Sequence, residues 1–587
     1  MSILGKLTEG VVSRDMKKEG AALLDKWEQT GLLEGLEGDV PRNNMARLLE
    51  NQAKQLLKEA ASSIAGGDVE GFAAVAFPIV RRVFGGLIAN DLVSVQPMSL
   101  PSGLIFFLDF TFGDERLDFS TTDSLYGGGR VGAEITGGVN LGEELGTAAG
   151  QFYNLTNGYS SPTGSDTSVG SKHIVSFGTF GGPPAGGDLS EAHVNSVLRY
   201  DPALTSGSTN YVIFEVDTST DLADLNKDNL VGITITNIGG AVAATEVSGT
   251  QLRRLTAFSG AAGQSPDRTQ SKVRLVIASD DVSATTLSSS LLAATLQCQF
   301  PIADEFDPGG ATGAVVGNNN DLGWGLENNP DIPEINLKVD SVSVTAITKK
   351  LKAKWTPELG QDLNAYHNLD AEVELTSILS EQIALEIDRE ILEDLVKGAQ
   401  GATYYWSRSP GLFVDKTTGA EVGANSAAPD FTGTVSEWYE TLLETINDVS
   451  AQIHRKTLRG GANFIVTSPE VASILEMTSG FRANVTVEGP KGTAGPQNVG
   501  SLNKRLDVHV DPYFPRNLVL VGRRGGSFLE SGYVYAPYVP LQVTPTIFGV
   551  EDFVPRKGVM TRYAKKMVRP DMYGLVICRG LLGESGE

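Results

Sequence analysis

The chain has 587 residues, of which 41% are hydrophobic and 20% charged, and this length predicts several domains or one domain with large insertions. Acidic residues outnumber basic ones by 71 to 47, and the resulting net charge of −24 argues against nucleic-acid binding as the main task. The sequence has no run approaching the roughly 18 apolar residues that a membrane-spanning helix requires.

Three helical segments open the sequence. We expect the first at about 21–36 and the second at about 43–61, with Gly66-Gly67-Asp68 as a flexible joint behind it. The third, at 72–88, has apolar residues at three- and four-residue spacing, with two arginines on the other side. This pattern predicts a helix that packs one face against the rest of the chain.

A strand is expected at 104–112, where Phe106, Leu108 and Phe110 share one face. Its expected partner, at 334–347, comes more than two hundred residues later. Two long strands that flank a large excursion predict an extended hairpin with a domain inserted at its tip.

The segment between these strands is rich in Gly, Ser, Thr and Asn. Short β-type runs recur in it, and no helix of convincing length interrupts them. The pattern therefore predicts a β-sandwich or a small barrel. The runs lie at 174–180, 211–216, 231–236 and 273–278.

The strongest single element is a helix at 370–397, which would extend about 42 Å at 1.5 Å per residue. Thr356-Pro357-Glu358 supplies an N-cap, a proline and an acid for the stretch that leads into it. Gly398 and Gly401 end it. Its apolar ridge repeats every four residues: Leu375, Leu379, Ile383, Ile387, Ile391 and Leu395.

The remainder of the chain alternates helix and strand, which predicts an α+β domain. Helices are expected at 438–453 and after Ser468-Pro469-Glu470. Strands are expected at 463–467, 506–510, 518–521 and 533–535.

Patterns that suggest ligand binding are weak. Gly127, Gly129 and Gly132 fit G-x-G-x-x-G, but a dinucleotide site needs a strand before them and a helix after them, and the sequence supplies neither. Asp224 opens a run that resembles a calcium loop, with Asn226 and Asp228 following. Asn229 and Ile235, however, occupy the positions of the required glycine and glutamate.

Other reactive residues also favour structural roles. None of the five histidines, His173, His193, His367, His454 and His509, has a ligand partner at metal spacing. Cys298 and Cys578 are expected to behave as small hydrophobic residues. The acids Glu386, Asp388, Glu390, Glu393 and Asp394 are interpreted as a solvated or intersubunit polar face. We therefore predict no catalytic, cofactor or metal site, and no enzymatic activity.

Several motifs, in matching order, resemble the major capsid proteins of T-even-type myoviruses. Val95-Gln96-Pro97-Met98 is the most diagnostic, within a longer match over 80–106. The other matches are LLDKW and LLEG at 23–35, ENQ at 50–52, LKAKWTPELGQDLNAYHNLDAEVEL at 351–375, EIDRE at 386–390, FIVTSP at 464–469, VDPY at 510–513, YAPYVPL at 535–541 and TRY at 561–563. The residues that carry this resemblance include Gln96, Pro97, Met98, Trp355, Tyr366, His367, Pro537, Tyr538, Arg562 and Tyr563.

The resemblance implies a Hong Kong 97-type capsid fold of the α+β class, with a spine helix and a large β-rich insertion in its extended loop. We match no family motif inside that insertion. The implied organisation is a helical leader at 1–59, an amino-terminal arm at 60–103, an extended loop at 104–350 with its insertion at about 113–333, a peripheral domain with the spine helix at 351–400, an axial domain at 401–540, and carboxyl-terminal strands at 541–587 that close the peripheral domain.

The function implied by the resemblance is structural. Head-to-tail contacts would close the subunits into hexamers, and the hexamers would tile the icosahedral or prolate head of a tailed phage. Implied partners are a scaffold, a head protease, a vertex protein and possible decoration proteins, with weak nonspecific contact to packaged DNA and no membrane. The implied location is the virion shell, assembled in the host bacterial cytoplasm. The acidic net charge suits such a wall, although solubility alone explains it equally well.

The family also loses its leader to a protease that cuts after glutamate in a Leu/Ile-x-Glu context. Glu59-Ala60 fits this context best, and Glu50-Asn51 is the rival. An ordinary amphipathic helix end explains both patterns equally well. A different class of function also stays open, a β-rich surface or receptor-binding protein that acts through residues 113–333.

Overall fold

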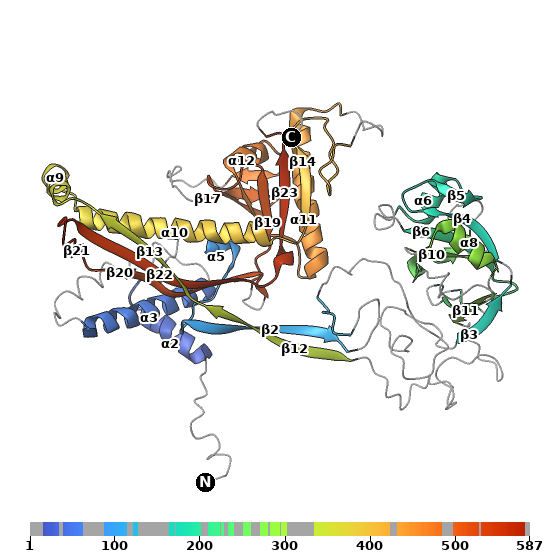
Figure 1. The fold of residues 1–587 in the computed structure, drawn as a ribbon, viewed down its shortest axis with the longest axis horizontal. Helices are drawn as coiled ribbons and strands as arrows, with labels where there is room; N and C mark the ends of the chain where they lie inside the picture. The colour runs from blue at the N-terminus through green and yellow to red at the C-terminus, as the bar shows by residue number, and fades with distance from the viewer. Residues whose placement is uncertain are drawn as a thin grey trace, which may run out of the picture. The chain divides into compact units, whose positions relative to one another are not determined.

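The computed structural model describes residues 16–34, 39–62, 87–113, 121–126, 164–170, 172–200, 209–223, 225–227, 230, 233–239, 250–259, 271–279, 282–293, 295–301, 334–422, 431–483, 497–526 and 530–581. The chain forms two compact units. The main unit comprises Met1–Phe107 with Val339–Glu587, and the inserted unit comprises Leu108–Lys338. The chain leaves and re-enters the main unit along β2 (Ser102–Phe112) and β12 (Ile335–Thr345), which pair as a two-stranded ribbon (Figure 1). The expected long strand pair is confirmed.

One sheet of the main unit has the strand order β1-β20-β22-β13, with β21 on β22. Its strands are β1 (Ser94–Val95), β13 (Ile347–Lys354), β20 (Tyr533–Val543), β21 (Ile547–Phe548) and β22 (Pro555–Met567). The long helix α10 (Ala371–Gly398) packs on β13 and β22 (Figure 1). We call this sheet the spine sheet.

The expected spine helix is confirmed, and its ends follow from its sequence. The Asp370 side chain accepts a hydrogen bond from the Glu372 N–H at 2.9 Å, which caps the start of α10. The ridge residues Ile383, Ile387, Ile391 and Leu395 are fully buried. Before it, α9 (Pro357–His367) is capped by Thr356 and ends where Asn368 adopts a left-handed conformation with φ of 52°.

The amino-terminal helices pack into the same core as the spine helix. They are α2 (Met16–Glu28) and α3 (Asp39–Ser62), and a short helix, α5 (Ala89–Leu92), precedes β1. The second expected helix is confirmed, whereas the first begins and ends earlier than the sequence predicts. Most of the third expected helix, at 72–88, lies outside the described residues.

A second sheet of the main unit has seven strands in the order β14-β23-β19-β15-β18-β17-β16. The helices α11 (Val435–Thr457) and α12 (Pro469–Glu476) share a hydrophobic core with it. A capping box between Thr434 and Glu437 starts α11. The strands are β14 (Thr403–Ser407), β15 (Phe464–Thr467), β16 (Phe481–Ala483), β17 (Gln497–Leu502), β18 (Leu506–Val510), β19 (Leu518–Gly522) and β23 (Tyr573–Arg579).

The last strand departs from the expected division of the chain. Residues 541–587 are expected to close the domain of the spine helix, and β22 does lie in that sheet. β23 instead pairs with β14 and β19 in the seven-stranded sheet. The physical reason is burial, because Tyr573, Val576 and Cys578 are apolar and bury in the cores of the main unit.

The inserted unit contains a six-stranded sheet in the order β5-β4-β6-β10-β8, with β9 on β10, and a three-stranded sheet in the order β3-β11-β7. The two sheets share one core, which contains Phe214, Leu275 and Cys298. The strands are β3 (Gly164–Val169), β4 (Lys172–Thr179), β5 (Pro184–Gly187), β6 (Asn210–Asp217), β7 (Thr234–Gly239), β8 (Thr250–Gln251), β9 (Ala257–Phe258), β10 (Lys272–Ser279) and β11 (Thr295–Pro301).

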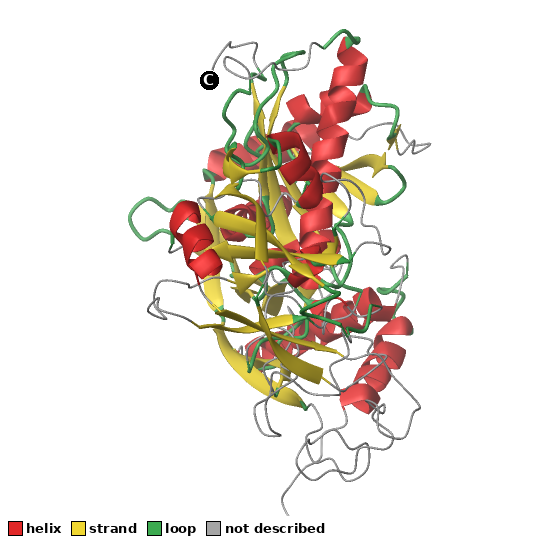
Figure 2. Ribbon diagram, turned by 90° about the vertical axis from the view of Figure 1, so that its right-hand side faces the viewer, coloured by secondary structure: helices red, strands yellow, loops and turns green. Residues whose placement is uncertain are grey.

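The predicted sandwich or barrel without helices is wrong in one respect. Two helices, α6 (Glu191–Val197) and α8 (Ala284–Ala293), lie in this unit. The Ser- and Thr-rich sequence of α8 has weak helix propensity. Leu287 and Leu291, four residues apart, are buried in the core shared by the two sheets, and this packing holds the helix. Helices and strands are mixed across the described chain, which confirms the α+β class (Figure 2).

Candidate functional site

The ribbon of β2 and β12 exposes apolar side chains. Leu104, Phe106, Leu108 and Phe110 alternate along β2 and therefore share a face, and they are 41–64% exposed. On β12, Ile335, Leu337 and Val339 are 55–59% exposed. Nearer the main unit, Ile105 and Val344 pack against Val534, Ala536 and Ala564 of the spine sheet. The ribbon is thus anchored at one end and presents an uncovered apolar surface, which is typical of a protein interaction site.

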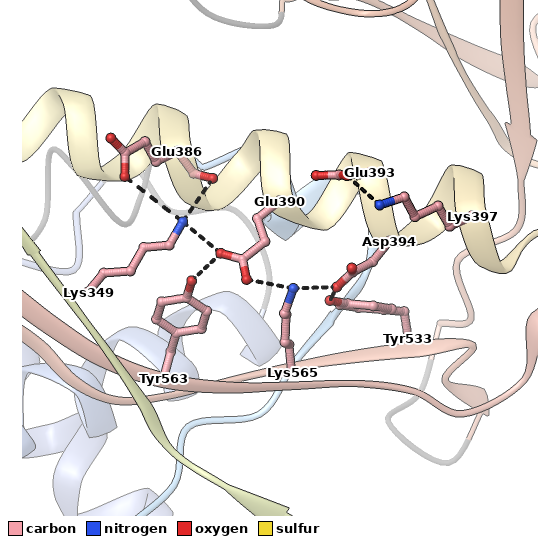
Figure 3. A network of polar contacts seen from close by, with 9 residues as sticks. All are labelled: Lys349, Glu386, Glu390, Glu393, Asp394, Lys397, Tyr533, Tyr563 and Lys565. Carbon is pink, nitrogen blue, oxygen red and sulfur yellow. Dashed lines mark hydrogen bonds and ion pairs between the residues drawn. The ribbon is translucent and has the colours of Figure 1, made fainter.

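A polar network joins the spine helix to the spine sheet (Figure 3). Glu390 lies at its centre, with Lys349 Nζ at 2.6 Å from one carboxylate oxygen and Lys565 Nζ at 2.6 Å from the other. The Tyr563 hydroxyl also donates to Glu390. One turn further along α10, Asp394 pairs with Lys565 at 2.7 Å and accepts from the Tyr533 hydroxyl at 2.8 Å. Strands β13, β20 and β22 each contribute to this network.

The network sets the charge state of Glu390. Burial alone would raise the pKa of this carboxyl, but hydrogen bonds from Lys349, Lys565 and Tyr563 outweigh burial and lower the pKa to about 2. Burial, followed by the bond to Glu390, raises the pKa of Tyr563 above its ordinary value. The carboxylate is therefore ionised and the tyrosine neutral throughout the physiological range, which keeps the network fully bonded.

A second acid of the spine helix is buried away from this network. Asp388 is 4% exposed, and its Oδ2 accepts from the Ile88 N–H at 3.4 Å. Its Oδ1 has no hydrogen-bond partner among the described residues. Burial raises the pKa of Asp388 to about 7, against the opposing effect of the Ile88 and Ala89 amides. The interpretation of this helix's acids as a solvated or intersubunit polar face is wrong for Asp388, which is buried, and Glu390 and Asp394 bond within the subunit.

Three of the family-like motifs meet on the spine sheet. The amides of Gln96 and Met98, on either side of Pro97, donate to the carbonyls of Tyr535 and Pro537 at 2.9 Å each. The Arg562 guanidinium lies 5.4 Å from the ring centre of Tyr538, and its neighbour Tyr563 bonds Glu390. The structure thus brings together residues from both ends of the chain.

The remaining motif residues lie elsewhere. The Trp355 amide, just after β13, donates to the Pro555 carbonyl at 3.3 Å. Tyr366 is 82% exposed, and both it and His367 lie in the last turn of α9. Trp355 thus bonds the first residue of β22 in the spine sheet, whereas Tyr366 and His367 belong to α9.

Both candidate cleavage bonds lie within α3. Glu50 pairs with Lys26 of α2 at 2.6 Å. Asn51 donates through Nδ2 to the Met98 carbonyl at 2.9 Å and to the Tyr538 carbonyl at 3.2 Å. Glu59-Ala60 lies within the last four residues of the helix. Cleavage at either position stays a prediction.

Several other candidate residues are buried in the part of the chain that the structure describes. Neither cysteine forms a disulfide, both are buried, and burial raises the pKa of Cys578 to about 12. His509 is buried, which lowers its pKa. Within the described ranges, no group of three or more His, Cys, Asp or Glu residues could hold a metal ion. Gly127, Gly129, Gly132, Asp224 and Asp228 lie outside these ranges.

Sequence reasoning missed the lysines and tyrosines that meet the spine helix. A signal was available, because Glu386, Glu390 and Asp394 recur every four residues and therefore form one acidic stripe. Their partners come from strands far away in the sequence, and no local pattern pairs them.

Within the part of the chain that the structure describes, no helix combines the length and apolar character needed to cross a membrane.

These features describe an α+β protein with an exposed apolar ribbon and a long helix bonded to its sheet. The profile of the family Major capsid protein Gp23 matches residues 69–288 and 241–581, and the chain belongs to this family. It is 35% identical over 268 residues to the major capsid protein of Vibrio phage KVP40, covering 44% of this chain and 50% of the relative. It is 31% identical over 255 residues to the major capsid protein of Enterobacteria phage T4, covering 41% and 47%. The chain thus spans about half the length of these curated relatives.

Solved capsid structures show partial likeness to the chain. The mature capsid of bacteriophage PhiM1 has 14% identity and a TM-score of 0.28, covering 42% of this chain and 74% of that one. The capsid of Myoviridae phage XM1 has 11% identity and a TM-score of 0.27, covering 42% and 78%.

Proposed function

We propose that this chain is the shell subunit of a tailed-phage head, that it has the Hong Kong 97-type fold, and that it assembles through hexameric capsomers around the genome. Membership of the major capsid protein family supports this proposal. The observation that carries it is the ribbon, because its Phe106, Leu108 and Leu337 side chains are exposed in the part of the chain that the structure describes. A second copy of the chain would cover these side chains, and head-to-tail repetition of this contact closes a ring.

The proposal extends to the partners that such a shell needs. A scaffold and a head protease would act during assembly in the host cytoplasm, and a vertex protein and decoration proteins would join the shell. The net charge of −24 keeps contact with packaged DNA weak. The acids Glu390 and Asp394 are bonded to lysines within the fold, which supports a structural role for these two side chains.

The ribbon contact can be tested with the full chain. Purified protein should sediment as hexamers or larger assemblies, and Phe106→Asp or Leu337→Asp should shift it toward monomer because a charge then replaces the apolar contact. Val435→Asp is the matched control. Val435 is an exposed apolar residue in the first turn of α11, where an acidic side chain suits the helix dipole.

Assemblies that persist in both ribbon variants would show that the ribbon does not carry the contact. A parent chain that stays monomeric at high concentration, even with scaffold present, would contradict the shell function itself. Binding of host-cell glycans by that monomer would then favour the receptor-binding alternative through residues 113–333.

A further inference from the structure

Strand β13 lies at one end of the spine sheet. It is the last strand in the order β1-β20-β22-β13, so one of its edges has no neighbouring strand among the described residues. Its pairing with β22 continues from Ile347 to Lys354 without a shift in register. The backbone N–H and C=O groups of the other edge can therefore pair with a further strand.

The two faces of β13 carry different lysines. Lys349 faces the spine helix, where it pairs with Glu390 at 2.6 Å (Figure 3). Successive residues of a strand point to opposite faces, so Lys350, Lys352 and Lys354 share the face turned away from α10. All three are exposed, and none of them forms an ion pair with another described residue. We call these three residues the lysine row.

The neighbouring strand adds positive charge beside the lysine row. Arg556 of β22 lies directly opposite Lys354 and is exposed, although Asp552 pairs with it at 2.8 Å. Like charges opposite each other on two strands destabilise a sheet, so the fold alone does not account for this arrangement. The chain carries 71 acidic and 47 basic residues, and its composition does not account for a row of cations either. The lysine row and the open edge together favour an acidic partner.

We propose that the open edge of β13 binds an extended acidic segment of another protein, which adds as a strand and sets carboxylates against the lysine row. Main-chain hydrogen bonds to the edge supply affinity, and the alternating lysines select acids at every second position. A second copy of β13 does not fit, because its own lysines would face the row. A nucleic acid carries negative charge but has no peptide backbone to pair with the edge.

The site gives the proposed shell a contact for an acidic accessory protein, and to that extent the inference rests on the proposed function. Its test uses the full chain below the assembly concentration. The probe is a peptide of the same length as β13 in which glutamate and threonine alternate. A second peptide has the same composition with its glutamates grouped at one end. We expect the alternating peptide to bind several times more tightly than the grouped one, because more of its acids reach the lysine row.

A charge-reversal variant tests the lysine row itself. Lys350→Glu with Lys352→Glu should weaken binding of the alternating peptide by roughly tenfold or more, because attraction becomes repulsion at two positions. The matched control is Lys54→Glu with Lys504→Glu, which changes two exposed lysines outside β13 and alters the net charge equally. The control should bind the peptide as the parent does. If circular dichroism shows that the charge-reversal variant is unfolded, Lys350→Gln with Lys352→Gln makes the same test without reversing the charge.

Hydrogen exchange locates the bound peptide, since the amides of residues 347–354 should exchange more slowly when it adds to the edge. Binding that protects none of these amides, or that both variants weaken equally, would overturn the site. Equally tight binding of a thymidine oligonucleotide of the same charge would show a general polyanion surface and also defeat the proposal. A parent chain that assembles but does not bind the peptide would remove this inference and leave the shell function intact.

Discussion

The strongest quantitative prediction concerns Glu390 of the spine helix. Glu390→Gln keeps the size of the side chain and removes its charge. It weakens the contacts with Lys349 and Lys565, whose side chains are only 26% and 21% exposed, and with the Tyr563 hydroxyl. Lys565 retains Asp394 at 2.7 Å, whereas Lys349 retains longer contacts with Glu386, at 4.0 Å to its carboxylate and at 3.5 Å to its backbone carbonyl.

The size of the effect follows from the pKa. A fall from 4.5 to about 2 corresponds to about 3 kcal/mol of preferential stabilisation of the ionised carboxylate. The Glu390 side chain is 23% exposed, and solvent screening reduces the expected loss of unfolding free energy to about 2 kcal/mol. Because the folded-state pKa is depressed, this stability is present above pH 4.5 and is lost as the pH falls toward about 2.

Glu393→Gln is the matched control on the same helix. Glu393 pairs with Lys397 at 2.5 Å, but both side chains are more than 60% exposed, so its loss should cost less than about 0.5 kcal/mol. Denaturant unfolding of the unassembled subunit, followed by tryptophan fluorescence, measures both variants. Equal effects of the two substitutions at pH 7, or a Glu390→Gln effect that persists unchanged at pH 3, would refute the reasoning.

Three further predictions use the same unfolding measurements or a chemical probe. Asp388 has a folded-state pKa raised to about 7, so its contribution to the free energy of unfolding is most favourable below pH 4 and is lost as the pH rises through 7. Asp388→Asn should flatten this pH dependence and raise the free energy of unfolding at pH 8 by up to about 4 kcal/mol. A variant that keeps the parent's pH profile would contradict this prediction. Gly187 has φ of 106°, and an added Cβ would lie 2.4 Å from the Val175 carbonyl oxygen. Gly187→Ala should therefore lower the free energy of unfolding of the inserted unit, measured by calorimetry, by more than about 2 kcal/mol. An unchanged unfolding transition would be evidence against this geometry. Cys578 is buried with its pKa raised to about 12, so a maleimide should label it only after unfolding, and rapid labelling of the native chain would show that the thiol is accessible.

The elements that the sequence predicts well are those with a local cause. The spine helix is predicted by its apolar residues at every fourth position, up to Leu395, and by the Asp370 cap. Both β2 and β12 are predicted by the alternation of apolar residues. The placement of β23 is not local, because its parallel pairing with β14 joins residues about 170 positions apart. α8 was missed for a related reason, since Leu287 and Leu291 gain their stability from the sheets rather than from helix propensity.

The sequence likewise predicts some features of the candidate site and not others. Exposure of Phe106 and its neighbours follows once the ribbon exists, but alternation alone could not show which face another element covers. The acids of α10 have nearly the same sequence context, yet Asp388 is buried beside Ile88 and Glu390 bonds two lysines. Helical spacing separates these faces, because two residues advance a helix by about 200°. The identity of the partners requires the tertiary fold.

The network also explains how a subunit could lose α3 and keep its spine sheet. Glu390 and Asp394 bond Lys349 of β13, Lys565 of β22 and Tyr533 of β20, so the spine helix holds three of the strands without help from the leader. The contacts of Asn44 and Asn51, by contrast, reach only the edge segment 94–98 and the adjoining β20. Loss of α3 would therefore remove these hydrogen bonds, while the charged contacts that fix the sheet to the spine helix would stay in place.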